Sequence, residues 1–190
     1  MSSVSNQILD SAQAMIQKRG YNGFSYRDIA SEVGVKSSSI HYYFPSKANL
    51  CEALIKRYRR QVNEAWNHIF ATEADPNVRL AQFVEGFVNT YKTKSGICLC
   101  GTLSADAESL NDNIRKEVQG FFADCEHWLA MVLADGRVRG LLNFQGQPET
   151  IARTFSMVMQ GGLLAARVHD DEAQLTAPAA WLSSVIGVPK

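Results

Sequence analysis

The sequence predicts an all-α protein of about nine helices, and three observations support this prediction. Apolar residues recur every three or four positions through most of the 190 residues, which is the period of a helix. No stretch alternates apolar and polar residues for long enough to form a sheet. Serine, glycine and proline stand where helices should begin and end, and no repeat or low-complexity tract interrupts the pattern.

The first two helices are short and clearly bounded. Residues 5–19 are expected to form the first helix, which ends at Gly20. Ser25 and Asp28 have the spacing of a capping box, in which side chains and backbone at a helix start exchange hydrogen bonds. Gly34 should end this second helix, because glycine readily adopts the left-handed backbone conformation found there.

A third helix follows the glycine turn. Residues 37–39, all serine, favour its start, and Pro45 stops it at Phe44. We expect Ile40, Tyr43 and Phe44 to face the core of this small domain.

Two short helices joined by a glycine turn are typical of a helix-turn-helix, the unit with which many proteins bind DNA. The outward side of its second helix would carry His41 and Tyr42 with the serines, which are small enough to let a helix end approach a phosphate backbone. Lys36 and Lys47 are expected to contact phosphates. The DNA-binding candidates are Ser25, Tyr26, Arg27, Lys36, Ser37, Ser38, Ser39, His41, Tyr42, Tyr43 and Lys47.

The charge of the chain is unevenly distributed. The whole sequence balances 19 Lys and Arg against 19 Asp and Glu. Residues 1–60 hold nine basic and four acidic residues, a net charge of +5, which leaves −5 for the remainder. A basic module on an acidic body is expected of a polyanion-binding domain joined to a regulatory domain, and ordinary scatter of surface charge is the alternative.

The motif in the first 60 residues resembles the N-terminal domain of the tetracycline-repressor (TetR) family of transcriptional regulators. The family pattern runs Thr or Ser, Ile-Ala, Gly-Val, an aromatic pair, Phe, and Lys at the next helix start. This chain supplies, in order, Ser25, Ile29-Ala30, Gly34-Val35, Tyr42-Tyr43-Phe44 and Lys47. It departs from the common form at Lys36, where Ser is frequent, and at His41, where Tyr is frequent.

The resemblance implies a homodimeric repressor that binds a palindromic operator in double-stranded DNA and is released by a small-molecule effector. It implies no cofactor. The helix-turn-helix domain would occupy residues 1–48, and a ligand-binding and dimerisation domain would occupy residues 49–190.

The helices of the larger domain follow from the same signals. A helix over residues 46–69 is too long for the small domain and should continue into the next. An apolar loop bounded by glycines, residues 95–101, would precede a short helix, and Pro178 would lie in the first turn of the last helix. The remaining helices are expected over residues 78–91, 102–110, 114–135, 149–169 and 177–186.

Large apolar side chains in this domain should form mostly core. The resemblance implies that some of them also line an effector pocket. The ligand-binding candidates are Trp66, Phe70, Phe83, Phe87, Tyr91, Cys98, Phe122 and Trp128.

Two adjacent glycines, Gly161 and Gly162, lie within the eighth expected helix. Each costs about 1 kcal/mol relative to alanine, which close approach of another helix would offset. The resemblance implies that the last two helices of each subunit form a four-helix bundle in the homodimer. The interface candidates are Leu163, Ala166, Trp181, Val185 and Ile186, and packing within the same chain is the alternative.

Cys98 and Cys100 are the most notable chemical pair outside the helix-turn-helix. One intervening residue is the wrong spacing for a zinc site, so we expect no metal. Burial in a tight loop is the simplest interpretation. Thiol sensing of an oxidant or electrophile is the alternative, and it requires a lowered thiol pKa and access to solvent. No catalytic set emerges elsewhere, so we expect no enzymatic activity, with an all-α thiol enzyme as the competing class.

The sequence also indicates in which cellular compartment the protein is expected. Residues 1–11 lack the basic start and apolar run of a signal peptide. The most apolar stretch, residues 155–168, is too short to cross a membrane. Four cysteines without secretory context indicate reduced thiols, so we expect a cytoplasmic protein with no membrane partner.

Overall fold

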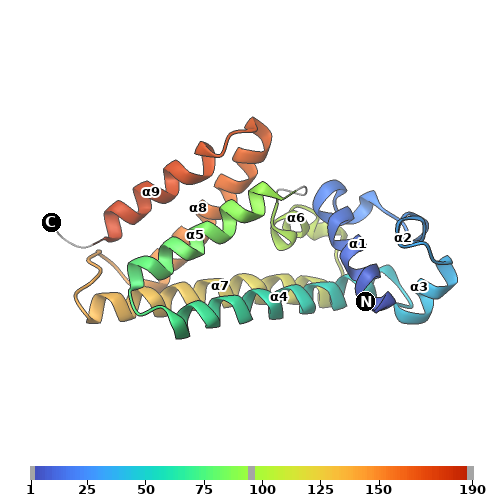
Figure 1. The fold of residues 1–190 in the computed structure, drawn as a ribbon, viewed down its shortest axis with the longest axis horizontal. Helices are drawn as coiled ribbons and strands as arrows, with labels where there is room; N and C mark the ends of the chain where they lie inside the picture. Colours follow the sequence, from blue (N-terminus) through green and yellow to red (C-terminus); the bar gives the residue numbers. More distant parts are fainter. Residues whose placement is uncertain (1–2, 94–96, 188–190) are drawn as a thin grey trace. The chain divides into compact units, whose positions relative to one another are not determined.

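The structure, a computed structural model, describes residues 3–93 and 97–187 (Figure 1). Over these residues the chain forms nine α-helices and no strand, which confirms the all-α prediction. The α-helices are α1 (Val4–Arg19), α2 (Tyr26–Val33), α3 (Ser37–Tyr43), α4 (Lys47–Thr72), α5 (Pro76–Lys92), α6 (Leu99–Ala105), α7 (Asp112–Val138), α8 (Pro148–His169) and α9 (Ala173–Ile186). Two short 3-10 helices, η1 (Tyr21–Gly23) and η2 (Ala107–Ser109), lie in connections. No helix in the described ranges is both long and apolar enough to cross a membrane.

The chain divides into two compact packing units. The first groups Met1–Arg60 with Leu99–Gly120, and the second groups Gln61–Cys98 with Phe121–Lys190. Helices α4 and α7 are each continuous from one unit into the other. These units describe packing, and the boundary between functional domains at residue 48 stays a prediction.

The capping residues of α2 are those expected from the sequence. The Asp28 carboxylate accepts hydrogen bonds from the Ser25 backbone N–H (2.7 Å) and from the Ser25 hydroxyl (2.6 Å). These bonds lower the pKa of Asp28, because they favour the charged carboxylate. At the other end Gly34 has φ 75° and ψ 33°, the left-handed conformation predicted for it.

The core of the first unit is apolar and draws on every helix of the small N-terminal domain. Ile40 is fully buried and Phe44 is buried, as predicted, but Tyr43 is 43% exposed. Helix α3 has only seven residues, so a single turn faces inward and Tyr43 lies at its edge. The expectation that Tyr43 faces the core is therefore wrong. Fully buried core residues of α1, α2 and α4 include Ile8, Ala12, Ile16, Ile29, Leu50, Leu54 and Ile55.

Helices α6 and α9 begin three and four residues earlier than predicted. Helix α6 begins at Leu99 and includes Cys100 and Gly101, which were expected in a loop. Leu99, Cys100 and Leu103 are all buried, so packing of one helical face outweighs the glycine signal. The Ser95 and Gly96 part of that expected loop lies outside the described residues.

Helix α9 begins at Ala173, so Pro178 lies inside it and not in its first turn. Asp171 and Glu172 provide the start, because the Ala173 N–H donates to the Asp171 carboxylate (3.0 Å) and the Thr176 N–H donates to the Glu172 carbonyl (3.0 Å). Proline has no N–H, so the helix continues past Pro178 without the bond that an N–H would donate there.

The second unit is built on packed aromatic rings. Trp66 of α4 and Trp128 of α7 stack with their ring centroids 6.1 Å apart, and Phe83 of α5 stacks on Trp128 at 5.8 Å. The Trp128 Nε1–H donates to the Trp66 carbonyl (2.9 Å), which satisfies the one polar group of that ring. Phe155 of α8 meets Phe83 edge to face at 5.9 Å. The cluster therefore joins α4, α5, α7 and α8 within this unit.

Candidate nucleic-acid interface

Helix α3 presents the most exposed part of the helix-turn-helix. Tyr42 is 83% exposed, although it is a large aromatic residue, and its ring meets that of Tyr43 edge to face at 5.2 Å. Of the DNA-binding candidates, Ser25, Arg27, Lys36, Ser38, His41, Tyr42 and Tyr43 are exposed, and Tyr26, Ser37, Ser39 and Lys47 are half-buried. The structure thus brings Lys36, Ser38, His41 and Tyr42 together on one short helix and its N-cap.

Tyr26 holds the end of α3 in place. Its hydroxyl donates to the Phe44 carbonyl (2.9 Å), and its ring meets the His41 ring edge to face at 4.7 Å. Burial raises the pKa of Tyr26 to about 12, so the hydroxyl keeps the proton that it donates. Tyr26 therefore fixes α2 against α3, a role that the sequence did not reveal.

Lys47 has an internal partner as well as the phosphate role expected for it. Its Nζ donates to the Phe24 carbonyl (2.6 Å) and lies 4.0 Å from the centre of the Phe24 ring. It also lies 5.0 Å from the centre of the Tyr21 ring, and burial lowers the pKa of the amine. Lys47 therefore connects the start of α4 to the residues before α2, whereas Lys36 carries its charge on an exposed side chain.

Much of the positive charge at the start of α4 is balanced within the first unit. Lys56 pairs with Glu52 (2.6 Å), and Arg59 pairs with Glu117 of α7 (2.7 Å). Residues 99–120 add two basic and four acidic residues, so the formal charge of the first unit is +3 and not the +5 of residues 1–60 alone. Arg27 and Lys36 are exposed basic side chains of the helix-turn-helix itself, and phosphate binding by them stays a prediction.

A distant segment holds the turn that precedes the helix-turn-helix. The Asp106 carboxylate accepts a hydrogen bond from the Tyr21 backbone N–H (2.7 Å). Next to it, the Asn22 side-chain amide donates to the Ser109 hydroxyl (3.0 Å). Both partners of each bond belong to the first unit. No sequence signal pointed to these contacts, since their partners are 85 and 87 positions apart.

The predicted ligand-binding residues belong largely to the packed aromatic cluster of the second unit. Trp66, Phe83, Cys98 and Trp128 are buried, and Phe70, Phe87, Tyr91 and Phe122 are half-buried. Phe87 contacts Phe83 at 5.3 Å and Phe122 contacts Phe121 at 5.5 Å, so these two lie against the cluster, whereas the Phe70 ring lies under the Arg79 guanidinium at 3.9 Å. Their role in binding stays a prediction.

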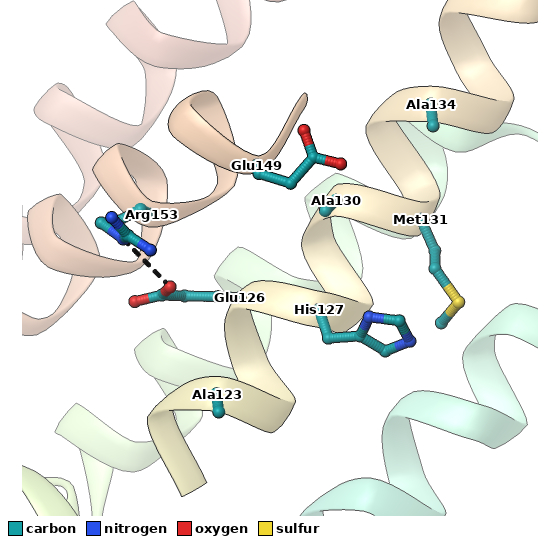
Figure 2. A pocket seen from close by; sticks show the side chains of 8 residues that line it. All are labelled: Ala123, Glu126, His127, Ala130, Met131, Ala134, Glu149 and Arg153. Carbon is teal, nitrogen blue, oxygen red and sulfur yellow. Dashed lines mark hydrogen bonds and ion pairs between the residues drawn. The ribbon is translucent and has the colours of Figure 1, made fainter. Parts of the chain in front are cut away.

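A shallow groove of about 360 Å³ lies elsewhere in the same unit, over α7 and the start of α8 (Figure 2). Arg153 of α8 pairs with Glu126 of α7 (3.1 Å) at one side of this groove, and Met131 and His127 project from α7 at the other. Its lining residues are Ala123, Glu126, His127, Ala130, Met131, Ala134, Glu149 and Arg153. None of the ligand-binding candidates lines it.

The dimer candidates divide into two groups. Leu163, Ala166 and Ile186 are buried within one chain, where α8 packs along α9, so they cannot offer a surface to a partner in this structure. Gly162 allows α8 and α9 to approach closely. A Cβ at this position would lie only 3.1 Å from the carbonyl oxygen of Gln174 in α9. For these three residues the alternative, packing within the chain, is the correct interpretation.

Trp181 and Val185 of α9 are exposed, Trp181 by 64%. Helix α8 adds an exposed stripe that the sequence analysis missed. It consists of Met157, Gly161, Leu164 and Val168. Their spacing of four, three and four residues places them on one helical face, and this signal was present in the sequence.

The four cysteines are buried. Burial raises the pKa of both Cys51 and Cys125 to about 12, and the Cys125 thiol lies 3.5 Å from the Ser156 hydroxyl. Cys98 and Cys100 are also inaccessible, which does not suit a thiol that reacts with an oxidant. Within the described ranges, no group of three or more His, Cys, Asp or Glu side chains is placed to hold a metal ion.

Comparison with known proteins covers both parts of the chain. Residues 8–54 match the family model "Bacterial regulatory proteins, tetR family", and residues 76–180 match "Tetracyclin repressor-like, C-terminal domain". The chain is 27% identical over 168 residues to an uncharacterized HTH-type transcriptional regulator in the lacX 3′ region of Lactococcus lactis subsp. lactis, covering 87% of this chain and 84% of the relative. It is 22% identical over 186 residues to the HTH-type transcriptional repressor NemR of Escherichia coli (strain K12), covering 96% and 93%.

A solved structure agrees with these matches over nearly the full length. The TetR-family transcriptional regulator from Agrobacterium tumefaciens superposes with a TM-score of 0.93 at 29% identity, covering 97% of this chain and 98% of that one. The second of the two family models alone spans more than half of the chain. This chain belongs to the TetR family of transcriptional regulators.

Proposed function

We propose that the protein is a DNA-binding transcriptional repressor that a small-molecule effector releases from a palindromic operator. The observation that carries this proposal is the face of α3, on which Tyr42, His41, Ser38 and the N-cap Lys36 are exposed and share one short helix. A large aromatic residue left 83% exposed contributes little to folding, so it fits a surface that contacts a partner. The family of the chain and the name of its relative NemR support repression as the outcome.

The repressor acts as a homodimer through α8 and α9. Trp181 and Val185 of α9, with Leu164 and Val168 of α8, give an exposed apolar surface on two helices that lie side by side (Figure 1). Burying this surface against its own copy would remove it from water and create a two-fold axis. A two-fold dimer presents two α3 helices, so its preferred DNA site is an approximate inverted repeat.

The effector binds in the second unit, at the aromatic cluster. The half-buried rings of Phe87 and Phe122 contact Phe83 and Phe121, which in turn contact Trp66, so they are the most accessible part of this site. Because α4 and α7 continue from this unit into the first, a change of packing here can reach the helix-turn-helix along an unbroken helix. A ligand achieves release only if it binds the DNA-free arrangement more tightly than the DNA-bound one. The buried state of Cys98 and Cys100 favours this effector over a thiol trigger.

The test of DNA recognition replaces single residues of α3 and its N-cap. Tyr42→Ala should weaken binding to a duplex selected from the source genome by about tenfold while leaving binding to random DNA nearly unchanged, because base contacts carry specificity. Lys36→Ala should weaken binding to both duplexes and reduce the slope of log affinity against log salt by about one, because the variant neutralises one phosphate fewer. Fluorescence anisotropy at several salt concentrations measures both effects.

Lys92→Ala is the matched control, since Lys92 is exposed on α5 and pairs with Glu172 (3.4 Å) in the second unit. It should leave both duplexes bound as in the parent. If Tyr42→Ala and Lys36→Ala also bound both duplexes as the parent does, α3 would not be the recognition helix.

A further inference from the structure

The His41 ring is held in one orientation on the exposed face of α3. Its Nδ1 lies 3.2 Å from the Pro45 carbonyl oxygen, and its ring meets the Tyr26 ring edge to face at 4.7 Å. Tyr26 is in turn fixed by its hydrogen bond to the Phe44 carbonyl (2.9 Å). A side chain held by contacts on two sides loses little conformational freedom when it binds, so His41 is arranged for recognition before DNA arrives.

The hydrogen bond to Pro45 determines which ring nitrogen carries the proton. A carbonyl oxygen only accepts, so Nδ1 must be the donor in this 3.2 Å bond. In a neutral imidazole the other nitrogen is then an acceptor. In its neutral form His41 therefore offers a lone pair at Nε2 on an exposed ring.

His41 shares a helical face with the serines at the start of α3. His41 follows Ser37 by four residues and Ser38 by three, so the three share one face of the helix. In a helix-turn-helix the N-terminal part of the second helix contacts base edges in the major groove. The donors that bases present there are the exocyclic amino groups, N4 of cytosine and N6 of adenine, whereas guanine N7 and O6 and thymine O4 accept.

We propose that His41 is a specificity-determining residue whose Nε2 accepts a hydrogen bond from an exocyclic amino group, of cytosine or of adenine, in each half-site of the operator. The proposal rests on the proposed DNA-binding function and adds the class of base that one named residue reads. At the same position guanine or thymine would place an acceptor against an acceptor, which disfavours both.

The experiment selects bound duplexes from a random library with the full-length parent and with His41→Phe. Phenylalanine keeps an aromatic ring against Tyr26, so it preserves the packing while removing both ring nitrogens. The parent should select cytosine or adenine at one position of each half-site. His41→Phe should select the same consensus at all other positions and lose the preference at that one.

A second experiment uses base analogues that lack the exocyclic amino group but keep the rest of the base. In the selected duplex, 2-pyrimidinone replaces cytosine, or purine replaces adenine, at the His41-dependent position. The parent should lose about tenfold in affinity, and His41→Phe should bind both duplexes equally, because it no longer uses that group. Nitrogen-15 NMR of the free parent should show neutral His41 protonated at Nδ1 and unprotonated at Nε2.

Several outcomes would overturn the proposal. These are guanine or thymine at the His41-dependent position, an unchanged consensus for His41→Phe, or a neutral His41 protonated at Nε2. A parent that selected no consensus would contradict the DNA-binding function itself, so failure of the inference and failure of that function can be distinguished.

Discussion

Replacing Arg79 with methionine should lower the free energy of unfolding by about 3 kcal/mol, the largest loss that we expect from one side chain. Arg79 is 6% exposed and donates from Nε to the Glu73 carbonyl (2.7 Å) and from Nη2 to the Phe70 carbonyl (3.0 Å). Its Nη1 pairs with Asp135 of α7 (3.0 Å). The guanidinium thus caps the carboxyl end of α4, whose last carbonyls have no helical donor, and joins α5 to α7.

Methionine fills a similar volume but donates no hydrogen bond, so the carbonyls of Phe70 and Glu73 lose their partners. Asp135 keeps a second partner, Arg139 (3.1 Å), which limits the loss. Urea unfolding at one fixed protein concentration measures the change. The matched control is Arg153→Met, because Arg153 is exposed and pairs with Glu126 (3.1 Å) at the surface, and it should cost less than about 0.5 kcal/mol. Equal midpoints for the two variants would contradict the role given to Arg79.

Replacing Trp181 with glutamate should weaken the homodimer on the order of 100-fold, because a buried aromatic anchor is lost and a charge enters an apolar interface. Trp181 is 64% exposed in the single chain, so the substitution should leave the fold of one subunit intact. Sedimentation velocity at micromolar concentration should show the parent as a dimer and the variant as a monomer. The variant should also lose its preference for an inverted repeat over a single half-site, since one subunit carries one α3.

Val138→Glu is the control for this change. Val138 is an apolar residue at the end of α7 that is 87% exposed and lies outside the exposed surface of α8 and α9. This variant should sediment as a dimer at the same concentrations as the parent. A Trp181→Glu variant that also stayed dimeric would place the interface elsewhere on the molecule.

The sequence was a good guide to the helix-turn-helix, whose helix boundaries depend on residues close together in the chain. The start of α2 depends on Ser25 and Asp28, three positions apart, and its end depends on Gly34. Pro45 follows α3 just after its last turn. Such signals act within one or two turns, so the helix-turn-helix could be located before its three-dimensional structure was known.

Contacts between residues far apart in the chain could not be predicted from the sequence. Arg79 pairs with Asp135, which is 56 positions away in the chain. The Tyr21 N–H donates to the carboxylate of Asp106, which is 85 positions away. Helix α6 begins before Gly101 because its buried face packs well, which outweighs a local signal. Neither the acid partners nor this packing follow a spacing that a sequence reveals.

The dimer candidates show a further limit. Helix α8 has two apolar faces, one with Leu163 and Ala166 and another with Leu164 and Val168. Periodicity identifies both faces, but it does not tell which face α9 of the same chain covers and which is left for a partner. The exposed fractions of these side chains decide between them.

Two duplexes show whether this TetR-family protein reads a specific operator with α3. One is the genomic fragment that the parent dimer selects, and the other has the same composition with its half-sites scrambled. At physiological salt the selected duplex should bind about a thousandfold more tightly or better. Its half-sites should form an inverted repeat protected on successive major grooves. Equal binding of the two duplexes at every salt concentration would mean that α3 does not recognise a specific sequence.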